Sequence, residues 1–149
     1  MDPYLAQKST TLGESTAMNT WIDYLLDSKP ISMIFGQCVP TLKSIVVHEI
    51  NLHHDGPRIL LRFDLAGFPE RPPKKWVESG FNRVQLRLLM LGVRELKLIG
   101  LQSTIQVDLE IFKDDCLTRV KADNGIFQLD VGAEFVTTEG ISAYVEASN

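Results

Sequence analysis

The stretch RILLRFDL, residues 58–65, carries the pattern that decides the fold. Every second residue from Ile59 to Leu65 is apolar, and most residues between them are charged. Because successive side chains of a β-strand point to opposite faces, this period of two predicts a half-buried strand. Asp55-Gly56, shortly before it, is a strong hairpin signal, so we expect the strand to pair with the segment that precedes the turn.

Residues 84–90 repeat the alternation, with apolar side chains at the even-numbered positions. We therefore expect these positions and the odd-numbered positions of 59–65 to face one core, with Leu61 and Leu86 both pointing inward. Gly92 is expected to turn the chain before a further, shorter strand.

The first strand is expected over residues 45–54, with Val46, Ile50 and Leu52 on its apolar side. The C-terminal part is β throughout, and Phe135 is expected among the apolar residues of its strands. Its expected turns and bulges lie at Asp114-Asp115, Asn124-Gly125, Gly132 and Glu139-Gly140.

The N-terminal part of the sequence lacks the alternation of apolar and polar residues. Residues 1–16 are polar and predict a mobile arm, and residues 17–149 are then a single mostly-β domain. Apolar residues at helical spacing predict a short helix from Trp21 to about Asp27, and Pro30 to Gly36 predict a second one. The expected fold class is mostly β (α+β): an antiparallel sheet or β-sandwich of seven to eight strands with one or two short N-terminal helices.

Composition excludes several classes of protein. The chain has 149 residues, 44% hydrophobic and 23% charged, which suits one soluble domain. It contains neither a run of about 18 apolar residues nor a secretory signal, so we expect a cytoplasmic protein without membrane association. The two cysteines, Cys38 and Cys116, are expected to be reduced thiols, although a disulfide between them stays open.

Charge is distributed unevenly along the chain. The net charge of −4 argues against nucleic-acid binding. Residues 58–97 contain nine basic and four acidic residues, a balance of +5, whereas residues 105–149 contain three basic and nine acidic residues, a balance of −6. The asymmetry either creates two oppositely charged faces or reflects charges that line the solvent side of strands.

No catalytic, cofactor or metal site emerges from the residue pattern. His48, His53, His54 and Asp55 are metal-ligand types, but adjacent residues of a strand face opposite sides, and His48 lies about 20 Å from His54 along an extended strand. Nothing around Cys38 predicts a catalytic thiol. The FPERPPKKW segment, residues 68–76, is either a partner-binding basic and aromatic loop or a rigid connection anchored by Trp76.

Three segments, DGPRILLRFDL (55–65), FPERPPKKW (68–76) and GFNRVQLRL (80–88), together resemble the immunity protein 50 family of bacterial polymorphic-toxin systems. The Trp21 helix, Phe35-Gly36, Pro40 and His48-Glu49 also fit. The resemblance implies a non-enzymatic, cofactor-free protein that binds a cognate toxin domain encoded by a neighbouring gene and so protects the producing cell. Trp21, Pro72, Trp76 and Asn82 are then expected to have structural roles.

Toxins that act as nucleases are basic, so an acidic surface of this chain is the expected contact. The candidate toxin-binding residues are Asp108, Glu110, Asp114, Asp115, Asp123 and Glu134. Two other functions stay open: a small-ligand or lipid carrier on a β-sandwich scaffold, and an uncharacterised enzyme. A homodimer formed through edge strands also stays open.

Overall fold

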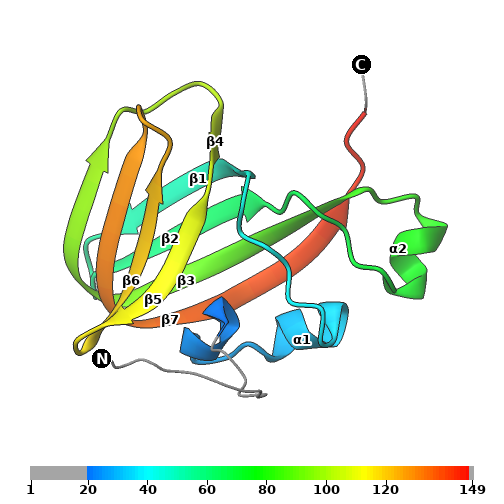
Figure 1. Ribbon diagram of the computed structural model, residues 1–149, viewed down its shortest axis with the longest axis horizontal. Helices are drawn as coiled ribbons and strands as arrows, with labels where there is room; N and C mark the ends of the chain where they lie inside the picture. Colours follow the sequence, from blue (N-terminus) through cyan, green and yellow to red (C-terminus); the bar gives the residue numbers. More distant parts are fainter. Residues whose placement is uncertain (1–19, 148–149) are drawn as a thin grey trace, which may run out of the picture.

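The computed structural model describes residues 20–147, which form one antiparallel sheet of seven strands with three short helical segments (Figure 1). The predicted mostly-β fold is thus confirmed. The predicted arm, residues 1–16, lies outside the described residues. The strand order across the sheet is β4-β1-β2-β3-β7-β6-β5. The strands are β1 (Ile45–His53), β2 (Arg58–Asp64), β3 (Arg83–Ile99), β4 (Ile105–Val107), β5 (Leu109–Asp114), β6 (Leu117–Asp123) and β7 (Gln128–Tyr144).

Two long strands make the sheet curl. β3 and β7 have 17 residues each and pair with each other along their length. β2 and then β1 extend the sheet beside the first half of β3, whereas β6 and then β5 extend it beside the first half of β7. The pairing skips Arg94 on β3 and Glu139 on β7, and such bulges bend a strand and increase its twist. Figure 1 shows the resulting two layers, which share β3 and β7.

The two edge strands of the sheet, β4 and β5, follow each other directly in the sequence. β4 ends at Val107 and β5 begins at Leu109, so only Asp108 separates them. β4 pairs with β1 and β5 pairs with β6, and the segment therefore passes from one layer to the other. The N–H of Leu109 donates to the C=O of Leu42 at 2.9 Å. This hydrogen bond ties the start of β5 to the segment before β1, and the buried residues of both layers form a single core.

The core contains the alternating residues that the sequence predicts. The odd-numbered residues of β2 and the even-numbered residues of β3 face each other inside the curl, and Leu61 and Leu86 are both fully buried, as predicted. Phe63 and Phe127 are the largest of the fully buried side chains and fill the interior between the layers. Burial of this apolar surface is the main stabilising contribution to the fold.

The prediction that Val46 shares the apolar face of β1 with Ile50 and Leu52 is wrong. Val47 pairs with Phe63 and Glu49 pairs with Arg62, so His48 has no partner in the register. This bulge reverses the parity of the strand. Ile45 and Val47 face the core before it, Ile50 and Leu52 share that face after it, and Val46 lies on the opposite face.

Two predicted turns are absent from the described chain. Gly92 lies inside β3, where its φ of +63° is followed by the Arg94 bulge, and Glu139-Gly140 forms the bulge inside β7. The predicted bulge near Gly132 is real, although the extra residue, Arg94, is on the opposite strand. The buried parity of β7 changes between Ala133 and Val136, and Phe135 between them is 48% exposed instead of buried.

The two N-terminal helical segments lie against β5 and β7, whereas the third lies apart at one end of the molecule (Figure 1). The predicted N-terminal helices are present as a 3₁₀ turn, η1 (Trp21–Tyr24), and an α-helix, α1 (Lys29–Phe35), which ends at Gly36 with φ +62°. η1 ends earlier than predicted because the N–H of Leu26 donates to the C=O of Val136 on β7. The proline-rich connection contains a helix that the sequence did not predict, α2 (Lys74–Glu78). Trp76 on α2 packs against Phe68, with ring centroids 6.0 Å apart, and this contact favours the alternative of a rigid connection anchored by Trp76.

Candidate functional site

Pairing of β5 with β6 brings three of the six candidate acidic residues together. Asp108, Glu110 and Asp123 line a surface hollow of about 310 Å³. Lys121, which pairs with Glu110 in the strand register, lies in the same hollow. The sequence separates Asp108 from Asp123 by a hairpin, and only the antiparallel pairing makes them neighbours.

Two of these three carboxylates also have structural contacts. Asp108 Oδ1 accepts a hydrogen bond of 2.9 Å from the N–H of Ser44, a residue with φ +55°. Asp123 Oδ1 accepts one of 2.8 Å from the N–H of Gly125 and so stabilises the β6–β7 turn. Glu110 is exposed and makes no side-chain hydrogen bond or ion pair to any residue in the range 20–147. Its carboxylate is therefore the most available of the three for a partner.

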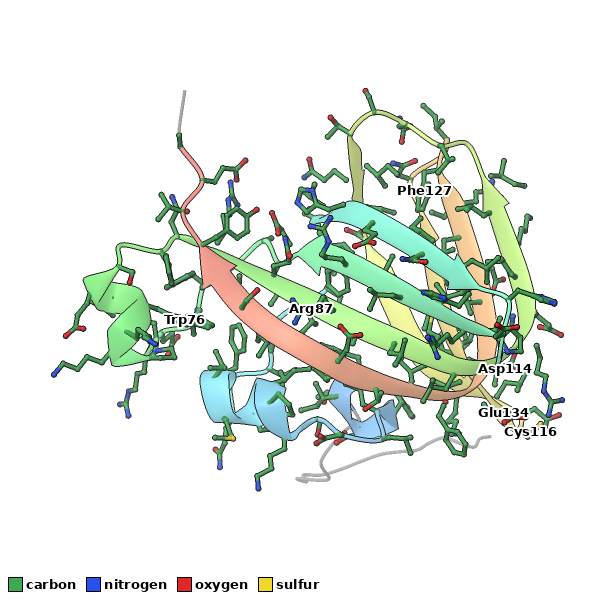
Figure 2. The ribbon with its side chains drawn as sticks, turned by 180° about the vertical axis from the view of Figure 1, so that it is seen from behind. Trp76, Arg87, Asp114, Cys116, Phe127 and Glu134 are labelled. Atoms are coloured by element: carbon green, nitrogen blue, oxygen red, sulfur yellow. The ribbon has the colours of Figure 1, made fainter. Side chains whose placement is uncertain are left out.

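The other three candidates lie at the opposite end of β5. Figure 2 shows Asp114 and Glu134 gathered with Cys116 at one corner of the molecule, away from Phe127. Asp115 occupies the β5–β6 turn with φ +61°. Asp114 accepts a hydrogen bond from Arg119, and Glu134 forms an ion pair with Arg94. The six residues thus form two groups, and in the second group two carboxylates are already paired with arginine.

The uneven charge of the sequence is largely neutralised where β3 meets β7. The basic segment contributes Arg83, Arg87 and Arg94, and the acidic segment supplies an ion-pair partner for each: Glu146 at 2.7 Å, Glu139 at 3.0 Å, and Glu134. Arg87 lies in the first half of β3, beside β7 (Figure 2). Antiparallel pairing of the two segments therefore favours the interpretation that charges line the strands over the one with two oppositely charged faces. Among the described residues of the acidic segment, the carboxylates without an arginine partner lie in or beside β5 and β6: Asp108, Glu110, Asp115 and Asp123.

Arg119 joins four strands at the corner of the curl. Its guanidinium contacts Asp114 at 3.2 Å, Asp130 at 2.9 Å and Glu95 at 2.6 Å, and its side chain is only 14% exposed. Hydrogen bonds to Asp130 and Glu95 raise the pKa of Arg119, which keeps it charged at any accessible pH. Nothing in the local sequence around Arg119 indicates this role, because its partners come from β3, β5 and β7.

A second polar cluster lies on the outer face of β1, β2, β3 and β7. The carboxylate of Asp64 is nearly buried and bonds to His48 Nε2 at 2.9 Å, to Gln85 Nε2 at 3.4 Å and to the hydroxyl of Tyr144. Burial, together with the hydrogen bond to Asp64, raises the pKa of Tyr144 to about 12. The cluster satisfies a buried charge, which is a structural role.

The sequence reasoning missed this cluster. Asp64 reads as an ordinary outward residue of an alternating strand, and Tyr144 follows it by 80 residues. His48 bonds to Asp64 rather than to His53 or His54. Within residues 20–147, no group of three or more histidine, cysteine, aspartate or glutamate side chains is placed to hold a metal ion.

Two further observations concern the thiols and the helices. Cys38 and Cys116 are both exposed free thiols, so they do not form a disulfide with each other. None of the helices described between residues 20 and 147 is long and apolar enough to cross a membrane.

Comparison with known proteins identifies the family. A family model described as immunity protein 50 matches residues 27–144, which is most of the chain and includes all seven strands of the sheet. Neither the curated proteins nor the solved structures contain a match to this chain. The matched range includes the three segments that carry the resemblance, and it continues through the C-terminal strands to the end of β7. The chain therefore belongs to the immunity protein 50 family.

Proposed function

We propose that this chain binds and neutralises a cognate secreted bacterial toxin by forming a stoichiometric complex with it in the cytoplasm. The observation that carries the proposal is family membership over residues 27–144. The toxin would be encoded by a neighbouring gene. Neutralisation of this kind needs no turnover, no cofactor and no contact with nucleic acid or membrane, because occupation of the toxin is sufficient.

The six candidate acidic residues, on or beside β5, β6 and β7, are the proposed contact surface. Glu110 is exposed on the outer face of β5 beside Asp108 and Asp123, and Asp114, Asp115 and Glu134 form the second acidic group. An acidic surface accelerates association with a basic toxin by long-range attraction. The ligand-carrier alternative has no comparable support, since Phe63, Phe127 and their neighbours fill the space inside the curl.

A rescue assay tests the proposal. The C-terminal domain of the large secreted protein encoded next to this chain is expressed in bacteria with and without the chain. Survival of the co-expressing cells and a one-to-one complex on gel filtration are the expected results. Killing that continues despite a well-folded, abundant chain would refute neutralisation of that toxin.

Charge substitutions then test the surface. Glu110→Lys reverses a charge that has no structural contact among the described residues, and Asp115→Asn removes one while keeping a residue that tolerates positive φ. Glu78→Lys on α2 is the control for charge reversal elsewhere on the surface, because Glu78 is exposed, its ion pair with exposed Lys74 is long at 3.9 Å, and it lies outside both acidic groups. We expect the pair of substitutions to slow association by roughly tenfold at low salt and the control to leave it unchanged. Equal association rates for all three proteins would refute the acidic contact surface.

A further inference from the structure

We propose that β5 is a docking strand: an extended segment of the toxin, with alternating apolar and basic side chains, adds to the sheet along the free edge of β5. The inference rests on the proposed function and specifies how the partner binds. β5 is the last strand in the sheet order, and it pairs with β6 on one side only.

Some backbone groups of β5 have no hydrogen-bonding partner among residues 20–147. Alternate residues of an antiparallel strand direct their N–H and C=O groups to opposite sides. Leu109 donates its N–H to Leu42, away from β6, so Ile111 and Lys113 point the same way. In residues 20–147, Leu42 is the one residue outside the strands whose backbone bonds to β5. The outward groups of Ile111 and Lys113 therefore suit the backbone of a further strand.

A groove with apolar walls runs beside this edge. It has a volume of about 610 Å³ and is lined by Trp21, residues 41–43 and residues 109–112. The indole Nε1–H of Trp21 donates to the C=O of Pro40 at 2.8 Å, which fixes the ring as one wall. A strand added to β5 would direct every second side chain into this groove, so those side chains should be apolar.

The outer face of β5 determines which side chains are favoured at the alternate positions of the incoming strand that do not face the groove. Asp108, Glu110, Phe112 and Asp114 all lie on this outer face, because they share the even parity of the segment. A neighbouring strand would place its alternate side chains beside three carboxylates and one aromatic ring. Basic residues are favoured there, and opposite charges across a strand pair stabilise it.

The same pattern disfavours a second copy of this chain as the occupant. An antiparallel pair of two β5 strands centred on Ile111 would place Asp114 of one copy opposite Asp108 of the other at both ends. Like charges directly opposite each other destabilise a strand pair. The charge of the edge thus selects a basic partner over self-association.

Lys113→Pro tests the edge directly. Proline removes an N–H that points away from β6, and Lys113 is exposed, so the substitution removes no β5–β6 hydrogen bond and no core contact. Lys113→Ala is the matched control, because it removes the same side chain and keeps the N–H. We expect Lys113→Pro to weaken binding of the toxin domain by about tenfold or more, and Lys113→Ala to change it by less than about threefold.

Amide hydrogen exchange of the unsubstituted chain provides a second readout that requires no variant. In the free protein the Ile111 amide should exchange faster than its neighbour Phe112, and it should become protected in the complex. Unchanged affinity of Lys113→Pro together with an unprotected Ile111 amide in the complex would overturn the inference. Protection of Ile111 in concentrated chain alone would overturn it in favour of a homodimer. If the unsubstituted chain binds no toxin, the proposed function fails and this inference fails with it; a loss confined to Lys113→Pro supports both.

Discussion

The substitution Arg119→Met tests whether the three contacts of Arg119 stabilise the fold more than a single surface ion pair does. Methionine keeps an apolar stem of similar length, so the packing that the arginine stem provides is largely retained. The substitution removes the guanidinium that Asp114, Asp130 and Glu95 share, and it leaves three carboxylates close together at the corner of the curl. We expect a substantial loss of stability with the fold intact.

The magnitude follows from the exposure of each partner. Glu95 and Asp114 are 59% and 53% exposed, and such pairs contribute about 0.2–1 kcal/mol each. Asp130 is 30% exposed, and its charge-assisted bond to the 14% exposed arginine contributes about 1.5–3 kcal/mol. Because shared contacts are not additive, we expect a total loss of about 2–3 kcal/mol.

Urea unfolding measures this loss. For a chain of this size we expect the midpoint to fall by about 1 M with an unchanged slope. Arg94→Met is the matched control, since Arg94 and Glu134 form a single pair with side chains 64% and 41% exposed. The control should lose less than about 1 kcal/mol. If the two variants unfold at the same urea concentration, the three contacts of Arg119 contribute no more than one surface pair, and the reasoning is refuted.

Two further predictions concern backbone geometry and pH. Gly100→Ala should lower the free energy of unfolding by about 3 kcal/mol or more, measured by thermal unfolding. Gly100 has φ +76°, and an added Cβ would lie 1.9 Å from the carbonyl oxygen of Ile126. Gly125→Ala is the control: Gly125 also has a positive φ but has open space around it, so its substitution should lower the free energy of unfolding by only about 1 kcal/mol. The pKa of Tyr144 is raised to about 12, so the folded chain holds the phenol proton more tightly than the unfolded chain does. The stability from this proton is complete below pH 10 and should decline as the pH rises from about 10 to about 12. Tyr144→Phe should flatten that part of the stability profile and remove the latest phenol titration from the ultraviolet spectrum; an ordinary titration near pH 10 for every tyrosine would contradict the buried contact with Asp64.

Local pattern predicted the strands well. Alternation in residues 59–65 and 84–90 determines which side chains face the core whatever the partner strand is, because side-chain direction in a strand depends only on the backbone of that strand. The turns at Asp55-Gly56, Asp114-Asp115 and Asn124-Gly125 were equally predictable, since the required backbone conformations favour these residue types.

The sequence did not indicate whether a glycine marks a turn or a bend inside a long strand. Gly92 and Gly140 read as turns, and each instead lies at a bend within a strand that continues. A glycine permits both outcomes, and the choice depends on whether a partner strand follows the chain past it. β3 and β7 supply that partner for each other over 17 residues, which no local window reveals.

The sequence by itself therefore determined the secondary structure class, the inward residues of most strands and the family. Tertiary structure alone decided the charge surface, because Arg83, Arg87 and Arg94 find their carboxylates across a strand pair rather than along the chain. It also decided which acidic residues remain available, and it placed β5 at an edge beside Trp21. The physical reason is that side-chain direction is a property of one strand, whereas charge compensation and edge exposure are properties of the pairing between strands distant in sequence.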